Sequence, residues 1–297
     1  MPLARFGKVL TAMVTPFHDD GALDLDGAAT LAQWLVAQGN DGLVIAGTTG
    51  EAPTLSDDEK VELWRAVRAA VDVPLLAGTG SNDTRHTIGL SQRAAETGVD
   101  GLLVVSPYYN RPPQAGLEAH FRAVAAATDL PIVMYDVPSR TARVIAVDTI
   151  VRLATEVPSI VGLKDARGNP AEAARIVAAS PDDFDVYSGD DGLTLALLAV
   201  GAVGLIGVAT HWSAGLHAEM VAAHGKGDLT RAREVNARLV ASFTVETGDT
   251  WVHTSAAKAA LAALGQPAGP LRLPLPPLDD DVRAAVARVL DDLGARP

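Results

Sequence analysis

One lysine in the sequence lies in surroundings that favour covalent chemistry. Lys164 ends an apolar stretch, 160–163, that contains only aliphatic residues and one glycine. An unbroken apolar run of this length is typical of a strand covered on both faces. A lysine at the end of such a strand loses hydration, which lowers its pKa and populates the neutral amine that attacks carbonyl groups. The ordinary alternative is that Lys164 reaches the surface or pairs with Asp165.

Other polar residues follow further short apolar runs. They offer hydroxyls, phenols and one guanidinium, and they occupy 47–51, 78–82, 107–110, 135–141 and 188–191. Taken singly, each segment is an ordinary turn, core residue or surface charge. Gathered on one rim, they describe an apolar-walled pocket for a carbonyl substrate that carries a carboxylate. There Lys164 would form an imine as an electron sink, Tyr135 would shuttle a proton, and threonine hydroxyls would hold the carboxylate.

The elements that would gather these residues repeat along the chain. Eight strand-like apolar runs occupy 10–14, 42–46, 74–77, 101–105, 131–135, 160–164, 184–188 and 203–208, with amphipathic helical patterns between them. Strict alternation with short connections predicts a parallel sheet, and eight units predict a closed (β/α)8 TIM barrel, whose working residues follow the strands. The rival, an open doubly wound sheet, would normally carry a glycine-rich phosphate loop after its first strand, and 18–21 is not one.

The pattern changes to helices alone after about Gly225. Helical spacing occupies 229–243, 252–264 and 280–293, and the proline-rich stretch 267–277 forms an extended connector. We therefore predict a barrel catalytic domain over residues 1–225 and a C-terminal all-helical domain over residues 226–297.

A long uncharged stretch, 192–218, has the length of a membrane span. Five glycines and several hydroxyl and imidazole side chains interrupt it, and it contains the eighth strand, without which the barrel would be open. We expect it to form a buried helix at 193–200, a strand at 203–208 and then a loop.

Composition excludes several kinds of partner. The formal charge of −12 and the isoelectric point near 4.9 would repel phosphate backbones and anionic lipid, so we expect neither nucleic acid nor a membrane as a partner. The absence of cysteine suits a cytoplasmic protein, and the apolar run 9–14 is too short for a signal peptide. The seven histidines have no metal-ligand spacing, so no metal is expected, and nucleotide-binding motifs are missing.

Five motifs in order, GTTGEA (47–52), PYYN (107–110), YDVPSRT (135–141), VGLKDA (161–166) and SGDD (188–191), resemble the dihydrodipicolinate synthase family of pyruvate-dependent lyases. The resemblance covers about residues 5–225. It implies that Lys164 forms the Schiff base with pyruvate without any other cofactor. It also implies a proton relay of Tyr135, Thr48 and Tyr109, in which Tyr109 reaches into the pocket of a neighbouring subunit.

The same resemblance implies the remaining substrate contacts. Thr49 would hold the pyruvate carboxylate, Arg140 would bind the carboxylate of aspartate semialdehyde, and Gly189 and Ile206 would line the site through backbone groups. The implied reaction condenses pyruvate with L-aspartate-4-semialdehyde to 4-hydroxy-tetrahydrodipicolinate, in lysine and diaminopimelate biosynthesis. The implied assembly is a homotetramer built as a dimer of dimers.

Alternatives remain within and outside this chemistry. N-acetylneuraminate lyases and keto-deoxy sugar acid enzymes keep the lysine and the tyrosine but change the second-substrate side, where Arg140 favours the synthase. A catalytically silent pyruvate-binding barrel is a more remote alternative.

A regulatory pocket is a further expectation from the resemblance. Asn82 and Tyr108 match the lysine-inhibited members, whereas Asp57, Lys60 and His86 stand where His, His and Glu are expected. These departures weaken the case for feedback by lysine.

Overall fold

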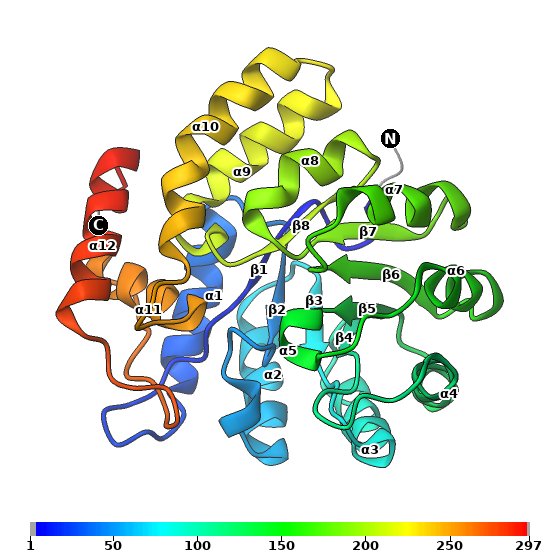
Figure 1. The fold of residues 1–297 in the computed structure, drawn as a ribbon. Coiled ribbons are helices and arrows are strands. Elements are labelled where there is room, and N and C mark those ends of the chain that lie inside the picture. The colour runs from blue at the N-terminus through cyan, green and yellow to red at the C-terminus, as the bar shows by residue number, and fades with distance from the viewer. Residues whose placement is uncertain (1–3, 296–297) are drawn as a thin grey trace.

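The barrel is closed and entirely parallel. In the computed structural model, which describes residues 4–295, β1 to β8 pair in sequence order and β8 returns to β1 (Figure 1). The strands are Val9–Ala12, Gly42–Ile45, Leu75–Gly78, Gly101–Val105, Ile132–Asp136, Ile160–Asp165, Asp185–Ser188 and Gly204–Gly207. Every strand lies within two residues of its apolar run, so the predicted (β/α)8 barrel is confirmed.

Helices follow the strands and cover the barrel. Those of the barrel are α1 Leu25–Ala37, α2 Asp57–Ala70, α3 Thr84–Ala95, α4 Gln114–Ala125, α5 Pro138–Thr141, α6 Val147–Glu156, α7 Pro170–Ala179, α8 Thr194–Ala199 and α9 Thr210–Gly225. Two short 3-10 turns, η1 Ala52–Thr54 and η2 Asp191–Leu193, interrupt the loops after β2 and β7. A capping box starts α2: the Ser56 hydroxyl accepts from the backbone nitrogen of Glu59, and the Glu59 carboxylate accepts from the backbone nitrogen of Ser56.

The expected loop after β8 is wrong. α9 already begins at Thr210, and the helix is kinked at Ser213, whose φ and ψ are −138° and 24°. The Ser213 hydroxyl donates to the Ala209 carbonyl oxygen at 2.7 Å, a local bond that competes with the helical ladder. The polar residues therefore mark a bend inside the helix.

The core has two layers, because strand side chains alternate between the two faces of the barrel wall. Val44, Val133 and Tyr135 belong to a cluster inside the barrel, whereas Leu43 and Ile132 pack in the cluster between the strands and the helices. Both faces of the strands are thus buried, which accounts for their unbroken apolar runs.

Three helices follow the barrel: α10 Leu229–Val245, α11 His253–Ala263 and α12 Asp280–Leu293. α10 packs beside α9, and α11 packs against α9 and α12 (Figure 1). Ala256, Leu261 and Val282 belong to the same apolar cluster as the barrel helices. The helical character of this region is confirmed, while its separation as a domain at residue 226 stays a prediction.

The uncharged stretch 192–218 is built into the barrel. It contributes to η2, α8, β8 and α9. Among residues 4–295, no helix combines the length and the apolarity that crossing a membrane requires.

We expect Phe121→Ala to lower the free energy of unfolding by about 3–5 kcal/mol, because Phe121 is fully buried between α4 and the strands and its removal leaves a cavity. Urea denaturation measures the change. Val240→Ala, on the exposed side of α10, is the control and should change stability by no more than about 0.5 kcal/mol. A similar loss in both variants would contradict the assignment of Phe121 to the core.

Candidate active site

The site is built around two side chains on adjacent strands. Tyr135 near the end of β5 is in register with Lys164 on β6, and both point into the barrel. The Lys164 Nζ lies 4.5 Å from the centroid of the Tyr135 ring, and Lys164 is only 5 % exposed. The two groups that were expected to share the chemistry are therefore in contact at the carboxyl end of the barrel.

Burial sets the charge of this lysine. Desolvation lowers the pKa of Lys164 to about 8, against the attraction of Asp191, while the positive charge of Arg140 acts in the same direction as burial. At pH 7 a pKa of 8 leaves about a tenth of the amine neutral, roughly 300 times the share of an ordinary lysine. Burial at the strand end thus lowers the pKa of this amine in the direction that the apolar run predicted, while its role as a nucleophile stays a prediction.

The alternative pairing of Lys164 with Asp165 is wrong. Strand alternation points Asp165 outward, where its Oδ2 lies 2.6 Å from Nη2 of Arg167. Arg167 is itself buried and also faces Asp136, 3.8 Å away. Within the described residues Lys164 forms no ion pair, so its amine is left available.

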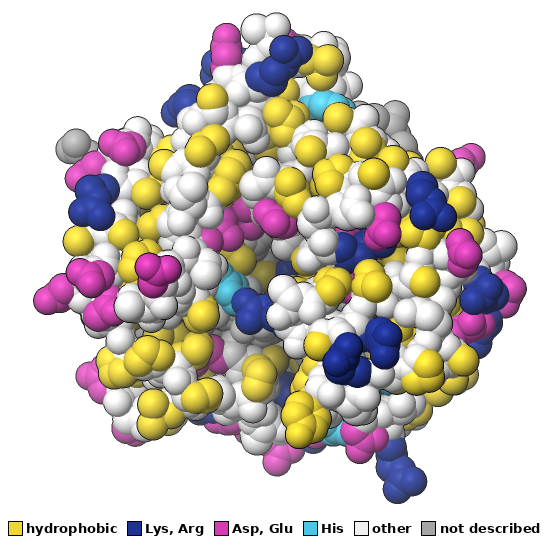
Figure 2. Space-filling view, viewed as in Figure 1, with side chains coloured by type: hydrophobic (Ala, Val, Ile, Leu, Met, Phe, Trp, Pro, Cys, Tyr) yellow, Lys and Arg dark blue, Asp and Glu magenta, His cyan; other side chains and the backbone are white. Residues whose placement is uncertain are grey.

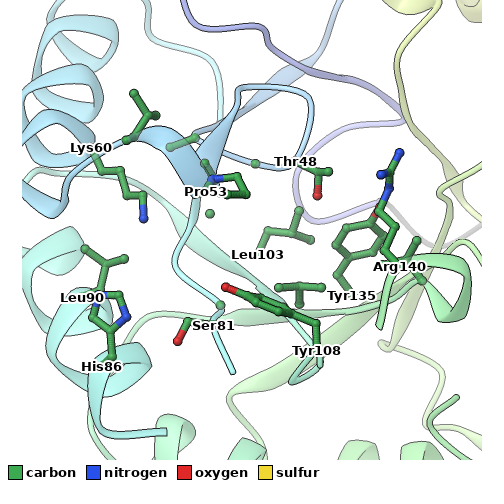
Figure 3. A pocket seen from close by; sticks show the side chains of 18 of the residues that line it. Thr48, Pro53, Lys60, Ser81, His86, Leu90, Leu103, Tyr108, Tyr135 and Arg140 are labelled. Atoms are coloured by element: carbon green, nitrogen blue, oxygen red, sulfur yellow. The ribbon is translucent and has the colours of Figure 1, made fainter. Parts of the chain in front are cut away.

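A cavity of about 430 Å³ opens next to this pair of side chains: Tyr135 lines it, whereas Lys164 is not among the lining residues. Thr48, Tyr135 and Arg140 surround one end of it, while Lys60 and His86 lie at the other (Figure 3). The surface in Figure 2 is hollowed near its centre, where basic, acidic and histidine side chains meet. Burial raises the pKa of the Tyr135 phenol, which the positive charge of Arg140 and the hydroxyl of Thr48 partly offset. The phenol therefore stays protonated near neutral pH and is available as a proton donor.

Arg140 is held by a histidine that the motifs did not indicate. Its Nη2 donates to Nδ1 of His253 over 2.9 Å, at the start of α11. Burial, helped by the charges of Arg140 and Lys164, lowers the pKa of His253 to about 3, so the imidazole is neutral and accepts the bond. The guanidinium, on the short helix α5 directly after β5, is thus oriented from the C-terminal region.

Three more predicted residues, Gly189, Ile206 and Thr49, are buried or close to the lysine but do not line the cavity. A Cβ at Gly189 would stand 3.0 Å from Cγ of Lys164 and 3.0 Å from Cβ of Ala166, a tight contact that the lysine could relieve only by shifting a few tenths of an ångström. Ile206 is buried inside the barrel in the same cluster as Tyr135. Thr49 is 3 % exposed and lies outside the cavity lining, so its contact with a carboxylate stays a prediction.

Tyr109 is the predicted residue that the chain does not bring to its own site. Its side chain is 89 % exposed and is not part of the cavity lining. Its φ of 69° is unusual for a residue other than glycine. Its role in a neighbouring subunit's pocket stays a prediction.

The expected regulatory residues are divided. Tyr108 and His86 line the cavity, whereas Asn82 does not, and its carbonyl accepts from Nδ2 of Asn110 over 2.8 Å. Asp57 lies between two basic side chains, 2.8 Å from Nε2 of His86 and 3.8 Å from Nζ of Lys60. Burial lowers the pKa of Lys60.

Two buried acids near the site, Asp191 and Glu246, were not predicted from the sequence as part of it. Asp190 accepts from the Gly192 backbone as a cap, but Asp191 is buried and uses Oδ2 to accept from Val208 N over 2.9 Å. Its other oxygen lies 3.6 Å from Nε2 of His217 and has no hydrogen-bond partner within residues 4–295. A second buried acid is Glu246, at the end of α10. Burial and, after it, the negative charge of Asp191 raise the pKa of Glu246 well above the usual range. Helix capping explains only the first of the paired aspartates.

The closed barrel and the desolvated lysine at the end of β6 are those of a (β/α)8-barrel enzyme that can form an imine with a carbonyl substrate. Residues 5–293 match the Dihydrodipicolinate synthetase family. The chain belongs to this family, which confirms the resemblance carried by the five motifs.

Individual relatives agree over nearly the whole chain. The 4-hydroxy-tetrahydrodipicolinate synthase of Acidothermus cellulolyticus is 53 % identical over 98 % of this chain and 93 % of the relative, and that of Bacillus subtilis is 41 % identical over 97 % and 100 %. The crystal structure of the Cyanidioschyzon merolae enzyme with lysine bound has a TM-score of 0.94 at 40 % identity, covering 97 % of this chain and 98 % of that one.

We expect labelling of Lys164 by an amine-reactive reagent to increase with pH and to reach half of its plateau at a pH of about 8, because only the neutral amine reacts and burial lowers its pKa. Peptide mass spectrometry at a series of pH values gives the rate at each lysine. The exposed Lys226 in the same digest is the internal reference. A Lys164 profile that still rises near pH 10, as for an ordinary lysine, would contradict the desolvated amine.

Proposed function

We propose that this chain condenses pyruvate with L-aspartate-4-semialdehyde to form 4-hydroxy-tetrahydrodipicolinate. The observation that carries the proposal is the desolvated Lys164 amine in contact with Tyr135. The amine attacks the keto carbon of pyruvate, a carbon–nitrogen bond forms, and the oxygen leaves as water. Loss of a methyl proton then gives an enamine, which attacks the aldehyde carbon of the second substrate. The amino group of that substrate displaces Lys164 and closes the ring, which restores the free amine.

Proton transfers in this sequence need a donor close to the lysine. Tyr135 serves this purpose with the hydroxyl of Thr48, which is near enough to influence the phenol. Tyr109 of a neighbouring subunit completes the relay, a role that its exposed position supports. In keeping with the family resemblance and with the absence of cysteine, we also propose that the protein forms a homotetramer in the cytoplasm. The protonated imine is the electron sink, so the reaction requires no metal and no further cofactor.

The two carboxylates of the substrates are bound at different places. Thr49 holds that of pyruvate, and the backbone groups of Gly189 and Ile206 line the pocket around the imine. Arg140, fixed by neutral His253 at the cavity wall, binds the carboxylate of the semialdehyde. A guanidinium suits this task because its planar fork matches a carboxylate.

Reduction with borohydride in the presence of pyruvate should add the mass of a reduced pyruvate adduct at Lys164. The reason is that borohydride traps the imine as a stable secondary amine. Intact-protein and peptide mass spectrometry locate the adduct, and Lys164→Ala is the control. Trapping that persists in Lys164→Ala would contradict the proposal.

Arg140→Ala should raise KM for the semialdehyde by about 10- to 100-fold, the effect of losing a charged hydrogen-bond partner. KM for pyruvate should change by no more than about threefold, since pyruvate does not use this guanidinium. Steady-state kinetics with each substrate varied in turn measures both. Arg143→Ala, two residues after the helix carrying Arg140 and outside the cavity lining, is the matched control. Equal effects of Arg140→Ala on both substrates would refute the assignment.

A further inference from the structure

The loop that carries Thr48 contains an unusual residue. Glu51 has a φ of 57°, in the left-handed region that favours glycine, and it is only 3 % exposed. A buried carboxylate and a left-handed backbone are both unfavourable for an isolated glutamate, and they persist only where surrounding contacts hold the residue in place. Glu51 has such contacts, with Lys258 and with the backbone of Arg272.

Its carboxylate is bound by two residues from the C-terminal region. Oε1 lies 2.8 Å from Nζ of Lys258 on α11, which has no exposed surface. Oε2 accepts a hydrogen bond from the backbone nitrogen of Arg272 over 2.9 Å. Lys258 also donates to the carbonyl oxygen of Pro270, and its amine stands 4.4 Å from the centre of the Phe17 ring. Glu51 is therefore fastened to a rigid, desolvated cluster.

The backbone of Glu51 is hydrogen-bonded to the turn that carries Thr48 and Thr49. Its nitrogen donates to the carbonyl oxygen of Thr48 over 3.1 Å, and the next nitrogen, of Ala52, donates to that of Gly47 over 3.2 Å. The hydroxyl of Thr15 donates to the Gly50 carbonyl at 2.6 Å. A shift of the carboxylate thus moves a closed turn that contains Thr48 and Thr49.

We infer that Glu51 and Lys258 are positioning residues: their buried ion pair holds the turn 47–52 so that Thr48 and Thr49 face pyruvate. A pair needed only for stability would be replaceable by apolar residues at little cost. Here the pair coincides with a strained backbone directly after the two threonines. The C-terminal helices thereby act on the chemistry through the loop after β2.

The inference rests on the proposed function, because it concerns the pyruvate end of the site. Misplacement of a substrate-binding group by about 1 Å can cost on the order of 100-fold in rate. Glu51→Gln and Lys258→Met should therefore raise KM for pyruvate by about tenfold or more. KM for the semialdehyde, which is bound by Arg140, should change much less.

The experiment measures steady-state kinetics, borohydride trapping against pyruvate concentration, and thermal midpoint in each variant. Glu51→Gln keeps the shape of the side chain. The double variant Glu51→Gln/Lys258→Met leaves no unpaired buried charge, so it serves if a single variant does not fold. Asp100→Asn is the control for losing an acid that binds a cation and a backbone nitrogen: the partly exposed Asp100 binds Arg68 and the backbone nitrogen of Leu75, at the opposite end of the barrel.

A raised pyruvate KM in the Glu51 and Lys258 variants, with no such rise in Asp100→Asn, supports the inference. Pyruvate kinetics that stay within about twofold of the unmodified protein, or that change no more than in Asp100→Asn, overturn it. The unmodified protein separates the two proposals. If it fails to trap pyruvate, the proposed function is overturned, whereas normal trapping in it and in all variants overturns only the role of the ion pair.

Discussion

Desolvation of a single amine is the constraint on which this structure depends. Lys164 must be buried deeply enough for its pKa to fall to about 8, yet its amine must remain open to a substrate. A closed parallel barrel meets both demands, because every strand is covered on both faces while its carboxyl end opens to the loops. The glycine at position 189 leaves the space that the lysine side chain occupies. The apolar run before Lys164 is the feature of the sequence that indicates this burial.

Keeping the amine free requires that nearby acids be directed elsewhere. Asp165 and Asp136 point to the outer face of the strands, where buried Arg167 faces both of them. Asp191 and Glu246 remain on the inner side, and each has an oxygen without a hydrogen-bond partner among the residues described. Burial raises the pKa of Glu246 well above the usual range. The charges that act on the lysine therefore oppose one another: Arg140 favours the neutral amine, whereas Asp191 and Glu246 favour a positive charge on its nitrogen.

The C-terminal helices take part in this balance. α11 supplies His253 to Arg140 and Lys258 to Glu51, and Glu246 stands at the end of α10. These contacts reach both sides of the cavity, the side of the threonine loop and that of the guanidinium. Dividing the chain into a barrel and a C-terminal helical part describes the order of its elements but not the contacts around the cavity. The active site itself draws on both parts.

The sequence by itself determined the barrel, the lysine at the end of a buried strand and the residues that follow each strand. Those features are local: an apolar run ending in Lys164 needs only its own neighbours in the chain to be recognised. The resemblance in five motifs then indicated the family. Tertiary structure alone decided how the charges are paired. The Arg140–His253 contact joins residues 113 apart, and the Arg272–Glu51 contact joins residues 221 apart. Such pairs leave no periodic signature, because hydrogen bonds and ion pairs depend on distance in space and not on spacing along the chain. For the same reason, only the packing of β8 and α9 around Asp191 revealed that this residue is a buried acid whose charge acts on Lys164.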